Sequence, residues 1–190
     1  MRITHRLDAR HSLVRYLATA QDGRQPPANP VSGHVPIRER TTLSSRFSRD
    51  ELVARIVRAG ELEVSGDHPE EVGSYFDVES FAFHGPDGFE SGYAGLTEYF
   101  ASVRDAFDDR TIRRGIVVAE GNLIACQTWI EGTFVRPFTH SPAGRLEPNG
   151  ARVVMDLINI FRLDDEGRLV EEFVRTDDRS LLRQLGADEA

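Results

Sequence analysis

The chain has 190 residues, of which 39% are hydrophobic and 28% charged, values typical of one globular domain with little room for a second core. A net charge of −8 excludes a general attraction to nucleic acid or anionic membranes, and no apolar run approaches the roughly 18 residues that a membrane-spanning helix needs. The single cysteine, Cys126, excludes an intrachain disulfide, and the N-terminus lacks the apolar region of a secretory signal, so we expect a cytoplasmic protein.

Residues 1–46 are predicted to form a disordered, arginine-rich arm ahead of a domain that spans residues 47–187. Arginines outnumber acidic residues in this segment by eight to three. Prolines and glycines interrupt residues 25–36, and apolar residues are too sparse to bury one face of an element. The arm is interpreted either as a tether for an anionic partner, or as a disordered extension or the product of a start site placed too far upstream.

Three helices are predicted in the first half of the domain. Ser48 and Glu51 have the spacing of a capping box, and apolar residues then recur at helical spacing to about residue 63. Asp67 followed by Pro69 predicts a second, short helix that ends near Tyr75. Residues 93–107 carry one apolar stripe and form the third predicted helix.

The second half of the domain changes from helical to alternating periodicity. A short strand or extended edge is predicted over residues 76–83, and later strands over 110–120, 123–135, 152–163 and 168–176. Residues 136–150 are predicted to be a loop, and residues 179–185 a short final helix. Helices followed by long strands predict an α+β fold, in which three helices pack on one face of a curved, mostly antiparallel sheet.

Several chemistries lack their sequence signatures in this chain. The six histidines are scattered, so no recognised ligand spacing supports a metal site. Neither a glycine-rich phosphate loop nor the serine elbow of an α/β-hydrolase is present. Cys126 lies within a predicted strand and is interpreted as an inert buried residue. We therefore expect no metal and no organic cofactor.

From about Ser48 to Gly186 the sequence resembles the SnoaL-like polyketide cyclases of the NTF2-like superfamily. The resemblance rests on short motifs in a shared order: His84-Gly85, Tyr93–Leu96, Ala106–Asp108, Ala119–Gly121, Thr128-Trp129, Glu131–Thr133, Ser141–Arg145, Phe161-Arg162, Gly167–Phe173 and Leu181–Gly186. It implies a cone that encloses one pocket for a small hydrophobic substrate. It also implies a homodimer that pairs through the open face of its sheet.

The resemblance further implies an intramolecular aldol closure that an acidic residue drives without a cofactor. This role falls on Asp177, four residues after Phe173, where the family pattern has a tryptophan and then an aspartate. The phenylalanine in place of tryptophan and a longer loop over residues 136–150 are departures from that pattern. The expected activity is cyclisation or isomerisation of a small, largely apolar carbonyl compound such as a polyketide.

Alternation along the last strand supports the same site independently. Leu169, Glu171, Phe173, Arg175 and Asp177 share one side of that strand, which we predict lines the cavity. In an apolar pocket the pKa of Asp177 would rise, which suits a general base, while His84 and Arg175 are candidate donors to the substrate oxygen. Asp177 is equally well placed to cap the following helix, and His84 can also be an exposed turn residue.

Further residues are predicted to line the pocket because of their strand or helix positions. The candidate substrate-binding residues are Phe83, Tyr99, Gln127, Trp129, Glu131, Thr133, Met155, Asn159, Glu171 and Phe173. Asp156 and Asn159 fall on opposite faces of one strand, so at most one of them is expected in the pocket. Trp129 suits either a pocket wall or an ordinary core.

Two other functions fit the same sequence. One is epoxide opening by two carboxylates and an arginine around a water, for which Arg175, Asp177 and Asp156 are candidates. The other is a non-catalytic module that binds a hydrophobic ligand. Replacing Asp177 by Asn would leave binding by such a module nearly unchanged, but it would slow a general-base enzyme by about 10²–10⁴.

Overall fold

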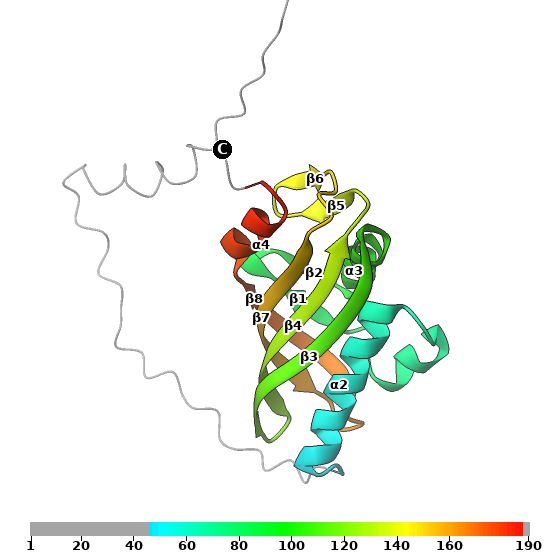
Figure 1. The fold of residues 1–190 in the computed structure, drawn as a ribbon. Coiled ribbons are helices and arrows are strands. Elements are labelled where there is room, and N and C mark those ends of the chain that lie inside the picture. Colours follow the sequence, from blue (N-terminus) through cyan, green and yellow to red (C-terminus); the bar gives the residue numbers. More distant parts are fainter. Residues whose placement is uncertain (1–45, 188–190) are drawn as a thin grey trace, which may run out of the picture. The chain divides into compact units, whose positions relative to one another are not determined.

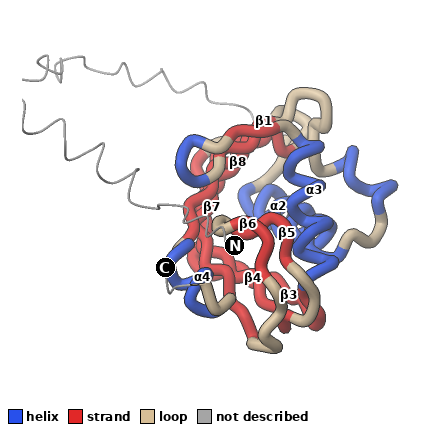
Figure 2. The backbone as a smooth tube through the Cα atoms, turned by 90° about the horizontal axis from the view of Figure 1, so that it is seen from above, coloured by secondary structure: helices blue, strands red, loops and turns tan. Residues whose placement is uncertain are grey.

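The protein is represented by a computed structural model that describes residues 46–187 (Figure 1). The predicted arm over residues 1–46 lies outside the described residues, except for its last position. The domain has a curved, open sheet of six strands. The helices that precede the long strands lie together on one side of this sheet (Figure 2). None of the helices in the described part of the chain is long and apolar enough to cross a membrane.

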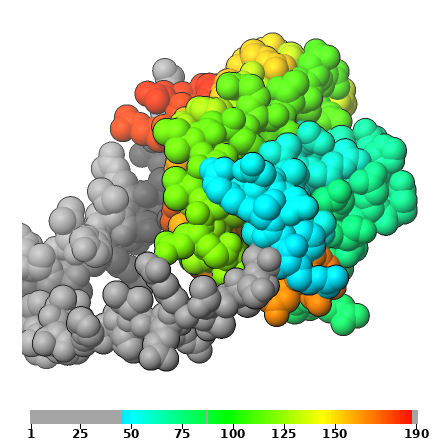
Figure 3. Space-filling view, turned by 90° about the horizontal axis from the view of Figure 1, so that it is seen from below, coloured from blue at the N-terminus to red at the C-terminus, as the bar shows by residue number. Residues whose placement is uncertain are grey.

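The first described helix, α2 (Arg49–Ser65), begins at the predicted capping box. The backbone amide of Ser48 donates to Glu51 Oε2 at 2.7 Å, and the amide of Glu51 donates to Ser48 Oγ at 3.3 Å. The helix ends at Gly66, whose φ of 75° suits the residue that has no Cβ. The predicted start of this helix is therefore confirmed. Figure 3 shows the segment of α2, in cyan, lying against the green middle part of the chain.

The second predicted helix is a 3-10 helix, η1 (Pro69–Ser74), rather than an α-helix. Six residues that include a glycine and bury no side chain give an α-helix little to stabilise it. The third predicted helix is confirmed as α3 (Tyr93–Ala106), and it ends where the first long strand starts. Two α-helices and one 3-10 helix thus precede the long strands in the described residues, together with a single 3-10 turn, η2 (Pro86–Gly88).

The strands of the main sheet follow the order β2-β1-β8-β7-β4-β3. Their bounds are β1 (Ala82–His84), β2 (Glu90–Ser91), β3 (Phe107–Glu120), β4 (Leu123–Phe134), β7 (Arg152–Leu163) and β8 (Leu169–Thr176). The pairing of β1 with β8 is parallel, and the other pairings in this sheet are antiparallel. The chain ends its described part with α4 (Asp178–Gln184).

The predicted loop over residues 136–150 contains a small hairpin. Strands β5 (Phe138–Ser141) and β6 (Gly144–Leu146) pair with each other in a separate two-stranded sheet. Phe138 is fully buried in the core, where it packs edge-on against Phe107 with ring centroids 5.3 Å apart. One buried aromatic residue therefore attaches the segment over residues 136–150, which was predicted to be a loop, to the core.

The main sheet has an inner face, toward α2 and α3, and an outer face that no element covers among the described residues. On β4 the inner side chains are buried: Ile124, Cys126, Thr128, Ile130 and Phe134. Two apolar clusters form on the inner face. The first joins Leu52 and Ile56 of α2 to Ile124 and Phe161, and the second joins Val103 of α3 to residues that include Ile130 and Met155.

Candidate functional site

Glu172 lies on the inner face of β8 and is the most strongly perturbed carboxyl in the interior. It is 9% exposed, and Asn159 of β7, which is 3% exposed, donates from Nδ2 to Glu172 Oε1 at 2.8 Å. Burial raises the pKa of Glu172 to about 7, although the charge of Arg114 and the bond from Asn159 act in the opposite direction. This carboxyl can therefore take up or release a proton near neutral pH.

Arg114 of β3 brings a positive charge to the same interior. Its Nη1 donates to Thr128 Oγ1 on the neighbouring strand, and its Nη2 donates to the backbone oxygen of Ile56 at 3.4 Å. The guanidinium carbon lies 5.4 Å from the ring centroid of Phe161. These contacts hold the guanidinium group between the sheet and α2, within electrostatic reach of Glu172.

A second buried carboxyl enters the interior from the helices. Glu63 near the end of α2 is 5% exposed, and its Oε1 accepts a hydrogen bond of 2.6 Å from the hydroxyl of Tyr93 on α3. Burial raises the pKa of Glu63, while the bond from Tyr93 and the charge of Arg104 lower it. Burial also raises the pKa of Tyr93, and Glu63 adds to this effect.

These side chains form an interior polar cluster that lies between the two apolar clusters. Its members are Glu63, Tyr93, Arg114, Thr128, Asn159 and Glu172. On β4, Thr128 stands between the apolar Ile124 of one cluster and Ile130 of the other, and Asn159 has the same position on β7. The arrangement offers two protonatable carboxyls, one guanidinium and hydrogen-bonding groups in an otherwise apolar core.

The side of β8 that was predicted to line the cavity lies on the outer face from Glu171 onward, and only Leu169, at the start of the strand, is buried in the core, so the prediction is wrong for the residues that carry the chemistry. The buried side of this strand carries Glu172 and Val174, whereas Arg175 is exposed on the other side. Phe173 stacks on His84 with ring centroids 4.5 Å apart, and Glu171 Oε1 lies 3.2 Å from His84 Nε2. Arg175 Nη1 donates to the backbone oxygen of Gly85 at 3.0 Å. The structure brings these residues together, but outside the core.

Asp177 lies on the surface at the start of α4. Its Oδ1 accepts a 2.9 Å hydrogen bond from the backbone amide of Ser180, so Asp177 caps this helix. The placement matches the alternative interpretation of Asp177 and gives no support to its role as a catalytic base. Asp156 is likewise exposed, whereas Asn159 is buried, so only one of this pair faces the interior, as predicted.

The β4 residues that were predicted to bind substrate lie on the outer face. Glu131 accepts two hydrogen bonds from Arg113, of 2.9 and 2.6 Å, and lies 3.4 Å from Arg152. The bonds from Arg113 hold the pKa of Glu131 below its usual range. The Arg113 guanidinium carbon stands 4.6 Å from the centroid of Trp129. Gln127 and Thr133 alternate with inner residues and share this outer side.

The remaining predicted binding residues lie on the inner side or at the sheet edge. Tyr99 packs in the second apolar cluster, and its hydroxyl lies 3.9 Å from Met155 Sδ. Burial raises the pKa of Tyr99 to about 12. Phe83 of β1 packs against the first apolar cluster. The sequence analysis missed five members of the interior polar cluster. The periodicity of a strand or a helix does not itself reveal which side is buried, and this hid Glu63, Tyr93, Arg114, Thr128 and Glu172.

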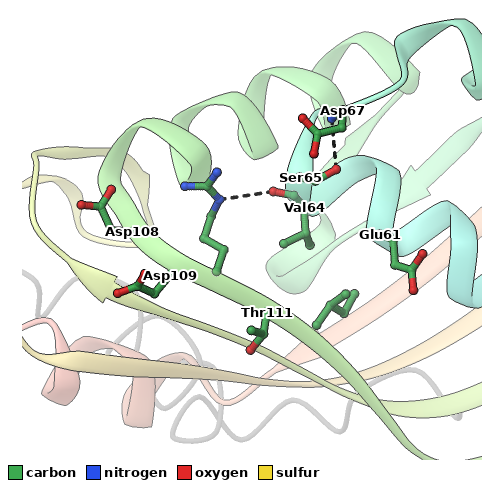
Figure 4. Close-up of a pocket in the computed structure, with 9 residues that line it drawn as sticks. Glu61, Val64, Ser65, Asp67, Asp108, Asp109 and Thr111 are labelled. Atoms are coloured by element: carbon green, nitrogen blue, oxygen red, sulfur yellow. Dashed lines mark hydrogen bonds between the residues drawn. The ribbon is translucent and has the colours of Figure 1, made fainter.

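A separate acidic groove opens on the surface between α2 and the start of β3. It has a volume of about 680 Å³ and is lined by Glu61, Val64, Ser65, Asp67, Asp108, Asp109, Arg110, Thr111 and Ile112, which Figure 4 draws as sticks. Arg110 crosses to α2 and donates from Nε to the backbone oxygen of Val64 at 3.3 Å. The groove shares no residue with the interior polar cluster.

Among the described residues, one largely exposed group at the start of η1 has the composition of a metal site. Ligand atoms of His68, Glu70 and Glu71 all lie within 4.8 Å of one another. Arg58 already donates from Nη2 to Glu71 Oε1 at 2.8 Å. The group is therefore accounted for as a surface ion-pair network, and exposed acidic groups without a metal are common.

The sequence pattern of the SnoaL-like polyketide cyclase family matches residues 55–185, and the chain belongs to this family. Solved structures share the fold. AclR from Streptomyces galilaeus, a provisionally assigned hydroxylase, is 22% identical with a TM-score of 0.61, and the match covers 73% of this chain and 98% of AclR. IdmH from Streptomyces antibioticus, a provisionally assigned polyketide cyclase, is 24% identical with a TM-score of 0.59, covering 72% and 99% of the two chains. Among curated proteins, no sequence matches this chain.

Proposed function

We propose that this member of the SnoaL-like family is an enzyme that performs cofactor-free acid–base chemistry on a small, largely apolar carbonyl compound such as a polyketide. The reaction would be an aldol-type cyclisation or an isomerisation, with Glu172 as the group that transfers the proton. The observation that carries the proposal is the buried Glu172 carboxyl, hydrogen-bonded to Asn159 inside an apolar core. A carboxyl with a pKa of about 7 populates both of its protonation states at neutral pH.

In the proposed cyclisation, the Glu172 carboxylate takes a proton from the carbon next to a substrate carbonyl. The electron pair of that C–H bond moves into the new enolate, whose oxygen the Arg114 guanidinium stabilises by its charge. The enolate carbon then attacks a second carbonyl carbon of the same molecule, and a C–C bond forms. The resulting alkoxide takes the proton back from Glu172, so the enzyme returns to its starting state.

Epoxide opening is a second candidate, because two buried carboxyls and an arginine share the interior. Glu172 as a carboxylate would accept a proton from a water molecule while the water oxygen attacks an epoxide carbon. Protonated Glu63 would then supply a proton to the released oxygen. This assignment replaces the earlier set of Arg175, Asp177 and Asp156, which lie at the surface or on the outer face.

We also propose that two copies pair through the outer face of the sheet. Large apolar side chains are exposed there on three strands: Val118, Leu123, Ile158 and Ile160. Charged residues such as Arg113, Glu131 and Arg162 surround them. An exposed apolar surface with a charged rim favours a protein interface.

The test of the catalytic proposal is Glu172→Gln, with Glu171→Gln as its control. Both changes remove one carboxylate from adjacent positions of β8, but only Glu172 faces the interior. Turnover of a panel of poly-β-ketone and diketone substrates should fall by about 10²–10⁴ in Glu172→Gln and stay within about twofold in Glu171→Gln. Wild-type turnover in Glu172→Gln would rule out Glu172 as the group that transfers the proton. No turnover of any of these substrates by the wild type would leave the non-catalytic binding module as the better account.

A further inference from the structure

Two polar atoms of the interior polar cluster lack a hydrogen-bond partner among the described residues. They are Asn159 Oδ1 and Arg114 Nε, and both atoms are buried. A buried polar atom without a partner has lost its hydrogen bonds to water and gained none in return, and native proteins rarely leave such an atom unpaired. One of these atoms is an acceptor and the other is a donor, so a single group that can both donate and accept would satisfy the pair.

The sheet register places these two residues close together. Cys126 of β4 lies directly opposite Asn159 of β7, and Arg114 Nη1 lies 3.9 Å from Cys126 Sγ. Each residue is also held in place by its other bonds. Asn159 donates to Glu172, and Arg114 donates to Thr128. These contacts fix the amide and the guanidinium while leaving one atom of each available.

We propose that Asn159 and Arg114 form a binding site for the hydroxyl or enol group of a small ligand, with Asn159 Oδ1 accepting its hydrogen and Arg114 Nε donating to its oxygen. A plain ketone lacks the hydrogen that Asn159 Oδ1 accepts. A carboxylate lacks it too, and would add a second negative charge beside Glu172. The inference deepens the proposed function, on which it rests, because it states that the substrate carries an O–H group in addition to the carbonyl that becomes the enolate. A buried water molecule has the same hydrogen-bonding chemistry, so the test must separate the two.

The test compares two probes of similar shape, 2-naphthol and 2-methylnaphthalene, by equilibrium dialysis. The wild-type protein should bind 2-naphthol at least about tenfold more tightly, which is the effect expected from one buried, charge-assisted hydrogen bond. In Arg114→Met and in Asn159→Leu this preference should fall below about threefold. Arg113→Met is the matched control, because Arg113 is the neighbouring arginine on the outer face, and it should keep the full preference.

Equal affinity of the wild type for the two probes, or no binding of 2-naphthol, would overturn the proposal in favour of a site that holds water only. A preference that survives in both interior variants would overturn it as well. Asn159→Leu retains the contacts of Arg114, so it carries the test if Arg114→Met does not fold. Glu172→Gln should keep the hydroxyl preference while it loses turnover. Failure of the binding site and failure of the proposed catalysis are therefore distinguishable.

Discussion

The inner and outer faces of the sheet carry the same residue types in opposite electrostatic settings. Adjacent glutamates on β8 show this most clearly. Burial raises the pKa of Glu172 on the inner face, whereas the hydrogen bond from Arg162 lowers the pKa of Glu171 on the outer face. The adjacent arginines of β3 divide in the same way: Arg113 pairs with Glu131 on the outer face, and Arg114 enters the interior. The chemistry of a side chain here depends on the face that it occupies more than on its type.

The largest expected difference between the faces concerns packing. Ile124 on the inner face is 0% exposed, and Ile158 on the outer face is 51% exposed. Ile124→Ala should lower the free energy of unfolding by about 2–5 kcal/mol, because it removes buried methyl groups and leaves a cavity. Ile158→Ala should lower it by less than about 1 kcal/mol. Urea unfolding of both variants at low protein concentration measures this, and similar losses would contradict the assignment of the faces.

The next effect is the pH dependence that Glu172 gives to stability. Its folded pKa of about 7 lies above the ordinary value of 4.5, so between these pH values the folded state holds a proton that the unfolded state has released. Stability contributed by this group is therefore full below about pH 4.5 and is lost as the pH rises through 7. Relative to Glu172→Gln, the wild type should lose about 3 kcal/mol between pH 5 and pH 8.

The control for that measurement is Glu171→Gln, whose effect should have the opposite sign. The pKa of Glu171 is lowered, so its contribution is present above its unfolded pKa and is lost as the pH falls. Urea unfolding at several pH values gives both curves. A flat difference between the wild type and Glu172→Gln would show that the carboxyl is not desolvated in the folded state.

A smaller effect is expected at Asp177. Asp177→Ala should lower the free energy of unfolding by about 1 kcal/mol, because the amide of Ser180 loses its acceptor. Asp177→Asn should preserve both stability and turnover, since an asparagine caps a helix about as well. A large loss of turnover in Asp177→Asn, measured with any substrate that the wild type converts, would restore Asp177 as a catalytic candidate.

The smallest effect on stability is expected on the outer face. Ile160→Asp should change the free energy of unfolding of the monomer by no more than about 0.5 kcal/mol, because this side chain is exposed. Sedimentation equilibrium should show a dimer for the wild type and a monomer for this variant. A wild type that stays monomeric at micromolar concentration would rule out pairing through this face.

The sequence predicts the fold well wherever a local rule specifies an element. Both hydrogen bonds of the predicted capping box at Ser48 and Glu51 are present. The four long strands lie within a few residues of their predicted bounds. The hairpin β5–β6 was missed, since its one buried aromatic, Phe138, is surrounded by turn residues. The 3-10 form of η1 was also missed, because proline and a preceding aspartate start either kind of helix.

The site was harder to predict than the fold for a reason that β8 illustrates. Its residues include apolar side chains on both sides, Phe173 on one and Val174 on the other. Alternation therefore allows two assignments of the buried face. The wrong assignment places Glu171 and Asp177 in the interior instead of Glu172. Only the register with the neighbouring strand decides between the two assignments. Asn159 lies on the buried side of β7 and stands opposite Val174, so the side of β8 that carries Val174 is the buried one.

The parallel pairing of β1 with β8 has a consequence for the order in which the fold assembles. The two strands meet across 87 residues of chain, as measured from His84 to Glu171, and Phe83 pairs with Glu172 itself. Contacts between segments so distant in sequence form late in folding, and a three-residue strand near the sheet edge is among the first elements to detach in native-state fluctuations. The backbone beside the buried carboxyl is thus expected to exchange its amide hydrogens early, which gives solvent a transient route to Glu172.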